Sequence, residues 1–452
     1  MTAGAFMSNR VSRWTLAYFA CALLNFVLAQ ALMIGGWAYP ARSLFAPDTL
    51  AAVHLITLGW LTLLMFGALL QFVPVISSQP LPSQKLALAA LILLEVGVLG
   101  MVAGFFALSA GAARFTHCLP LGGTLVTLGA LLSIVNITIP LLRARPLPLP
   151  GRFVLVGFAF LLATLTLGLL FALALTVPAA RALLVPLLGE GIGMHALAGF
   201  GGWFTLTAIG VSYKLLPMFM LAPEERGAPG EAVFYLCVVG LAFAFGAGIA
   251  HLYRPTEALA LAMNLGLVAA GVGLVFYLAD VARIYRTRRR AVVELHNRVA
   301  VGAFVALAAA ALIAAVLIAS GTLAVHGGVL GFVVLFGWLS GLGLTQLYKI
   351  VPFLTWLGRF GSRLGRGPVP RVQDLVDERH AVHWFHIYFA AVAVGAIAGF
   401  AGQVTVWRGA LAVSAVATLM LMLEYWRAWR GTYADRPRAP VAVPPKFFEG
   451  RS

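Results

Sequence analysis

Charged residues are scarce in this sequence. Asp, Glu, Lys and Arg make up 10% of the 452 residues, and hydrophobic residues make up 62%, whereas a soluble domain carries about 25% charged and about 45–50% apolar residues. Apolar stretches of about 20 residues, the length that crosses a bilayer, recur from Trp14 to Trp429. The composition excludes a soluble protein and predicts an all-α polytopic membrane protein embedded in the lipid bilayer.

Acidic residues and cysteines are also few. The chain has 15 acidic against 31 basic residues, a formal net charge of +16. The cations lie in short loops beside apolar spans, which is the positive-inside pattern of membrane proteins, so no nucleic-acid partner is expected. Cys21, Cys118 and Cys237 are isolated from one another and form neither a C-x-x-C pair nor a C-x-x-C-H haem-attachment motif. They are most simply packing residues.

Charge and Pro/Gly clusters divide the chain into about twelve spans. The predicted spans lie at about 14–39, 50–77, 85–108, 118–142, 152–177, 192–220, 231–253, 257–285, 298–320, 327–357, 382–403 and 406–430. If the N-terminus is cytoplasmic, most cations fall on the inner side, and the outer side holds only Arg42, Arg114, Arg181, Arg254 and Arg408. We therefore expect a multi-pass protein of the cell inner membrane with both termini cytoplasmic. Residues 1–430 form one integral domain, and 431–452 are expected to be a disordered cytoplasmic tail.

A threefold internal repeat is the strongest pattern in the sequence. Three spans carry Gly-Trp, then Leu or Phe, then Thr or Ser, and after eleven intervening residues a proline. The motifs are Gly59–Thr62 with Pro74, Gly202–Thr205 with Pro217, and Gly337–Ser340 with Pro352. The spacing predicts three pseudo-repeats of four helices, at about 14–142, 152–285 and 298–430, and such repeats place functional sites at their interfaces.

Polar residues within the apolar helices are candidates for an intramembrane site. Leu70, Tyr213 and Tyr348 coincide in the repeat register, and Gln71, Lys214 and Lys349 follow them directly. The lysines either extend to the membrane surface or line an inner polar pocket for an anion or protons. Glu95, in the middle of the third span, is either neutral or paired across helices, and a proton or cation role is open to it.

Each repeat helix also carries a histidine on the same side of its Gly-Trp pair. His54 lies five residues before Gly59, His195 seven before Gly202, and His326 eleven before Gly337. Imidazole is a common ligand of haem iron and copper. The alternative is that each histidine caps a helix or lies among lipid head groups.

Twelve helices in three pseudo-repeats, with histidines near the outer starts of helices 2, 6 and 10, resemble the catalytic subunit of the haem-copper oxidase superfamily, which includes nitric-oxide reductases. The resemblance implies that His54 and His326 are axial ligands of a low-spin b-type haem and that His195 is a copper ligand. The chain departs from the family pattern because helix 10 has one histidine where the family has two. The family's adjacent pair of copper-binding histidines after helix 6 is also missing, and His251 is a single candidate for that role.

These departures define the functional expectation. We expect one b-type haem, copper only with an incomplete ligand set, and a role in respiratory redox or nitric-oxide-related metabolism without a complete oxygen-reducing site. The electron donor would be a redox partner protein or a companion subunit. The alternative is a non-haem membrane transporter or assembly factor with the same fold. Whether the protein is an enzyme is left open by the sequence.

Overall fold

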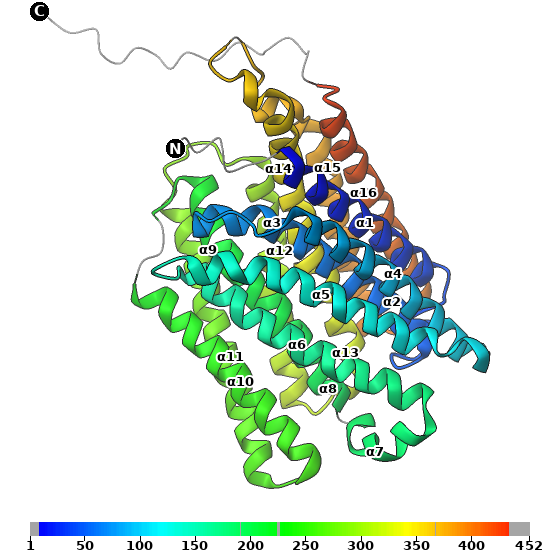
Figure 1. Ribbon diagram of the computed structural model, residues 1–452. Coiled ribbons are helices and arrows are strands. Elements are labelled where there is room, and N and C mark those ends of the chain that lie inside the picture. The colour runs from blue at the N-terminus through cyan, green and yellow to red at the C-terminus, as the bar shows by residue number, and fades with distance from the viewer. Residues whose placement is uncertain (1–8, 190, 224–226, 367, 434–452) are drawn as a thin grey trace, which may run out of the picture.

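The computed structural model describes residues 9–189, 191–223, 227–366 and 368–433, and within these ranges the chain is helical with no β-strand (Figure 1). Twelve helical segments are long and apolar enough to cross a membrane. The protein is therefore an all-α multi-pass membrane protein, as the sequence predicts. Of the predicted tail at 431–452, residues 434–452 lie outside the described residues.

Nine of the twelve spans each consist of a single long helix, and the short helix α7 (Pro178–Leu188) lies outside the spans. The long helices are α1 (Asn9–Ile34), α4 (Gln84–Ser109), α5 (Cys118–Arg143), α6 (Leu149–Thr176), α10 (Ala228–Tyr253), α11 (Glu257–Arg286), α12 (Leu295–Ala319), α15 (Glu378–Phe400) and α16 (Val404–Arg430). The short helix α7 (Pro178–Leu188) lies in the connection after α6. The first helix ends at Ile34 rather than at the predicted residue 39, because the chain turns at Gly35 and Gly36.

The other three spans are the repeat helices, and each consists of two α-helical parts joined by a π-helical segment. They are α2 (Pro47–His54), η2 (Leu55–Thr62) and α3 (Leu63–Ser77); α8 (Gly191–Ala196), η4 (Leu197–Leu206) and α9 (Thr207–Met220); and α13 (Leu323–Phe332), η5 (Val333–Ser340) and α14 (Gly341–Phe360). We refer to them as the first, second and third repeat helices.

The repeat helices lie near the centre of the bundle. Half or more of the most apolar stretch of each is buried, against 11% for α11. Three of the four fully buried tryptophans, Trp60, Trp203 and Trp338, lie on them. The outer helices pair as hairpins, and glycines allow their backbones to approach closely, since a Cβ on Gly104 of α4 would lie 2.4 Å from the backbone nitrogen of Leu119 on α5.

The two ends of the bundle differ in charge. One end holds the loop after α11 and the loop after α14, which carry the arginine groups 283–290 and 359–379. We call it the basic end. The start of α1 and the end of α16 lie at this same end (Figure 1), and the histidine-bearing starts of the repeat helices lie at the opposite end.

Candidate functional site

The π-helical segments occupy the same register in all three repeat helices. Each contains the Gly-Trp pair, at Gly59, Gly202 and Gly337, and each ends at or one residue after the following Thr or Ser. π-Helical turns are rare and occur frequently at functional sites. The sequence analysis missed these segments, although the repeated motif marks their position.

The tryptophans of the motif link the repeat helices in a cyclic pattern. Trp60 Nε1 donates to Ser340 Oγ at 2.8 Å, and Trp203 Nε1 donates to Thr62 Oγ1 at 3.1 Å. In each case the indole of one repeat reaches the hydroxyl of the preceding repeat, as a threefold arrangement predicts. We call these three tryptophans and their motif hydroxyls the tryptophan layer.

The third link of this pattern is open. Trp338 Nε1 is buried with no hydrogen-bond partner in the described part of the chain. Its expected acceptor, Thr205, instead donates through Oγ1 to the carbonyl of Phe200 at 2.6 Å. In the tryptophan layer, hydrogen bonds therefore join the first repeat helix to the third and to the second. The layer is open between the second and third repeat helices, because Trp338 makes no such bond within the described chain.

A cavity of about 750 Å³ lies between the tryptophan layer and the histidine end of the bundle. No charged residue is among its described lining residues, and its polar groups are hydroxyls and two histidines. Eight glycines are among its lining residues, namely Gly123, Gly168, Gly189, Gly193, Gly199, Gly327, Gly328 and Gly331. Its volume lies within the ~300–1,000 Å³ typical of cofactor and ligand sites. We call it the histidine cavity.

The two histidines of this cavity are His54, the last residue of α2, and His195 on α8. Their ring centres are 6.3 Å apart with 32° between the planes. His54 Nδ1 bonds the carbonyl of Leu50 at 2.7 Å, and His195 Nδ1 bonds that of Thr164 at 3.0 Å. Since a carbonyl only accepts, each Nδ1 carries the proton, and each Nε2 keeps its lone pair.

The Nε2 atoms of His54 and His195 have no hydrogen-bond partner among the described residues. Metal-ligating histidines characteristically donate their other N–H to a carbonyl or carboxylate, as both do here. Two imidazoles bound to one metal at about 2 Å per bond have ring centres roughly 6 Å apart. The ring separation, the donor set and the glycine-lined apolar volume thus fit a planar metal cofactor such as haem.

The structure does not bring His326 to this pair. His326 lies in the first turns of α13 with its ring 5.4 Å from that of Phe400 on α15, and it is not among the residues that line the histidine cavity. The six extra residues between His326 and its Gly-Trp pair, compared with His54, place it nearer the end of the bundle. The pairing of His54 with His326, which the family resemblance implies, is therefore replaced in this geometry by His54 with His195.

His251 also lies apart from His195. It sits near the end of α10, where its Nδ1 accepts a hydrogen bond from the backbone of Thr256 at 3.4 Å. It does not line the histidine cavity. Across the described residues, no three side chains of His, Cys, Asp or Glu converge as a metal-binding group.

Lys349 is held by a carboxylate that the sequence analysis did not single out. Its Nζ lies 2.5 Å from Glu294 Oε2, and both side chains are largely buried near the basic end. Glu294 also pairs with Arg290 and accepts from Gln373 at 3.2 Å. Burial alone would raise the pKa of Glu294, but the hydrogen bond and charge of Lys349, with the neighbouring cations, lower it below its usual value. Lys349 thus binds a protein carboxylate.

The remaining polar candidates are dispersed. Glu95 Oε2 accepts from Asn25 at 2.9 Å, and Gln71 donates to Thr15 at 2.9 Å. Tyr213 donates to Asp280 at 2.7 Å, Tyr348 is buried with its hydroxyl unpaired within the described chain, and Lys214 is half-buried on α9. None of these residues lines the histidine cavity. They do not form one polar centre.

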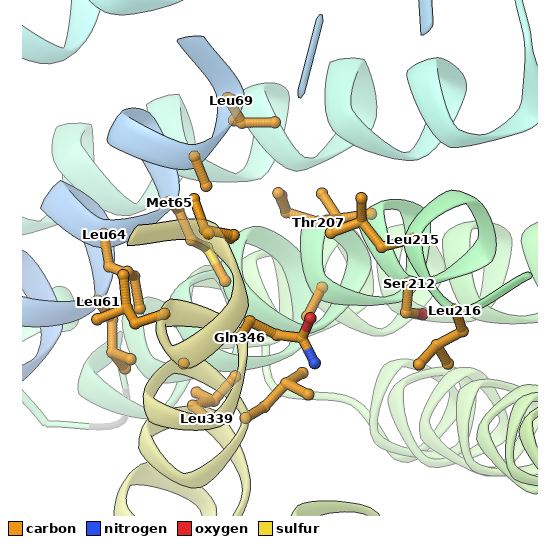
Figure 2. Close-up of a pocket in the computed structure, with 17 residues that line it drawn as sticks. Leu61, Leu64, Met65, Leu69, Thr207, Ser212, Leu215, Leu216, Leu339 and Gln346 are labelled. Atoms are coloured by element: carbon orange, nitrogen blue, oxygen red, sulfur yellow. The ribbon is translucent and has the colours of Figure 1, made fainter. Parts of the chain in front are cut away.

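A second, narrower cavity of about 100 Å³ lies between the three repeat helices on the basic side of the tryptophan layer (Figure 2). Its lining includes the fifth, sixth, ninth and tenth residues after the motif glycine in every repeat helix. These are Leu64, Met65, Ala68 and Leu69; Thr207, Ala208, Val211 and Ser212; and Leu342, Gly343, Gln346 and Leu347. We call it the axial cavity, because equivalent positions of the three helices surround it.

Comparison with known proteins adds no assignment to these sites. No protein-family model matches the sequence, and no curated protein matches it significantly. The functional argument therefore rests on the residues and geometry of this chain.

Proposed function

We propose that this chain is a haem-binding redox protein of the cell inner membrane with a haem-copper oxidase-like fold and both termini cytoplasmic. The observation that carries the proposal is the pair His54 and His195, which face one glycine-lined cavity with each Nδ1 tied to a carbonyl. The resemblance supplies the cofactor class, one b-type haem, and the cavity supplies a donor set that fits it.

The chain's own residues hold and shield the cofactor. Leu50 and Thr164 fix the tautomer of the two histidines through their carbonyls. Gly168 makes room for the His195 ring, because a Cβ there would lie 3.1 Å from its Cε1. Apolar walls limit water at the site, which is one of the factors that set a haem potential. When bound, a haem held by both histidines supplies one-electron redox chemistry.

A complete haem-copper centre is not part of this proposal. The two histidines of the cavity serve as haem ligands, and the described residues bring no further histidine to them. Because both histidines would hold the haem, a bound haem would favour electron transfer over oxygen reduction. The electron donor or acceptor is then a separate redox protein or a companion subunit.

A transporter or assembly factor of the same fold is the second candidate. It is favoured by one observation, namely that cavities lie on both sides of the tryptophan layer. A substrate that crosses the membrane between the three repeat helices would have to pass this layer.

The reduced-minus-oxidised visible spectrum of the detergent-purified protein, with its haem-to-protein ratio and total metal content, separates the two candidates. A b-type spectrum near one haem per chain supports the redox function. Absence of haem after expression with ample haem supply overturns it and leaves transport or assembly.

A further inference from the structure

The axial cavity contains polar groups on one side only. The first repeat helix contributes apolar side chains, whereas the second contributes Thr207 and Ser212 and the third contributes Gln346. At the position of Gln346 the other helices have Ala68 and Val211. The polar residues of the lining therefore lie on the second and third repeat helices, between which the tryptophan layer is open.

Two of these polar side chains lack partners. Gln346 Oε1, Gln346 Nε2 and Thr207 Oγ1 are all buried, and none has a hydrogen-bond partner within the described residues. Thr207 Oγ1 lies against Gly157 of α6, where a Cβ would be 2.4 Å from it, so the Gln346 amide is the unpaired group that the cavity has to satisfy. The Gln346 amide extends into the space between the helices (Figure 2). Ser212 differs, because its hydroxyl bonds both the Ile209 carbonyl and the Tyr277 hydroxyl. An amide left unpaired within a membrane bundle is costly, so a hydrogen-bonding ligand is required.

The size of the cavity limits that ligand. A volume of about 100 Å³ holds several water molecules, since about 10–15 Å³ of such space accommodates one. The same volume is smaller than the ~300 Å³ at which cofactor and drug-sized sites begin. The amide of Gln346 both donates and accepts, which matches water.

The cavity extends toward the basic end of the bundle. Its lining reaches Leu216 and Ile350, thirteen or fourteen residues beyond the motif glycines, and begins at Leu61 and Leu339 directly after the tryptophans. Lys349, the neighbour of Ile350, is joined to Glu294 near the basic end. This largely buried ion pair thus lies one helical turn along α14 from Gln346.

We propose that the axial cavity is an inlet that holds a short chain of water molecules bonded to the Gln346 amide, extending from the basic side as far as the tryptophan layer. This inlet goes beyond the proposed redox function and does not depend on haem. It brings water to the opposite side of the layer from the histidine cavity.

Cysteine labelling tests the proposal in the full-length chain. In a background with Cys21, Cys118 and Cys237 changed to Ala, Gln346→Cys and Ala68→Cys are treated with 2-aminoethyl methanethiosulfonate, and labelling is followed by mass. Leu344→Cys is the matched control, because Leu344 lies on the same helix two residues away and is fully buried. We expect both cavity cysteines to react at least about tenfold faster than the control, since a thiol in apolar packing forms little thiolate.

A second variant tests the role of the amide. Adding Gln346→Leu to the Ala68→Cys chain fills the polar side of the cavity, and labelling of Cys at 68 is expected to fall to the rate of the control. The proposal is overturned if the cavity cysteines react no faster than Leu344→Cys, or if labelling at 68 is unchanged by Gln346→Leu. If the double variant does not fold, the comparison with Leu344→Cys decides alone.

Discussion

The three repeat helices line both the histidine cavity and the axial cavity, but α1, α4, α5 and α6 also line the histidine cavity, and the two cavities differ in size. The histidine cavity is about 750 Å³, with eight glycines and two oriented imidazoles in its lining, and the axial cavity is about 100 Å³ and packed with leucines around one unpaired amide. The tryptophan layer and its π-helical segments separate them. The three repeat helices thus share one backbone pattern, and differences in a few side chains give the two cavities different polar groups.

The largest expected effect in this comparison is the loss of haem on replacing a ligand. His54→Ala removes one of the two paired imidazoles, so the haem-to-protein ratio should fall by more than about tenfold. His326→Ala is the matched control, because that ring lies outside the cavity against Phe400. Retention of a full haem complement by His54→Ala would contradict the assignment.

Filling the histidine cavity should reduce haem binding without unfolding the protein. A Cβ on Gly331 meets no atom within 4 Å, so Gly331→Leu places its side chain in the open cavity. We expect several-fold less haem per chain, while the elution volume on size exclusion stays the same. Gly271→Leu, at an exposed position on α11 that also has open space, should leave haem content unchanged. Equal haem contents in the two variants would argue against this cavity as the site.

The ion pair of Glu294 and Lys349 should give the basic end a pH-dependent stability. Glu294 is ionised and paired with Lys349, so Glu294→Gln should lower the stability by about 1–3 kcal/mol at neutral pH. Because its pKa is lower in the folded than in the unfolded chain, the stabilisation is present above its usual value of 4.5. It declines as the pH falls below that value and is lost once the pH passes through the lowered pKa. Thermal unfolding of both proteins between neutral and acidic pH measures this, and parallel curves for the two would refute it.

The smallest expected effect is a difference in stability between two substitutions in the tryptophan layer, one at a hydrogen-bonded tryptophan and one at the tryptophan without a partner in the described chain. Trp60→Phe removes a hydrogen bond to Ser340, whereas Trp338→Phe removes an indole N–H with no partner in the described chain. The two substitutions change side-chain volume equally, so Trp60→Phe should be less stable than Trp338→Phe by about 0.6–1.7 kcal/mol, the range for hydrogen bonds between membrane helices. Unfolding in mixed detergent measures the difference, and equal losses would mean that the layer is not asymmetric.

The twelve spans were predictable because bilayer-length apolar runs and charged loops are local features. The shared position of His54 and His195 was partly predictable, since both lie before the Gly-Trp motif. Their pairing was not, because it depends on how far each histidine lies from the motif and on which helices converge. Glu294 was missed because it follows the arginine-rich loop, where a surface position is expected. Its partner Lys349 lies 55 residues away in the sequence, and only the fold brings the two together.

The proposed ligand role of His195 has the most direct test. His195→Gly and His326→Gly are purified side by side, and visible spectra are recorded before and after addition of imidazole. The geometry predicts that His195→Gly loses the low-spin b-type spectrum and regains it with imidazole, while His326→Gly matches the unaltered protein. A wild-type spectrum for His195→Gly, or its loss in His326→Gly, would contradict the pairing of His54 with His195.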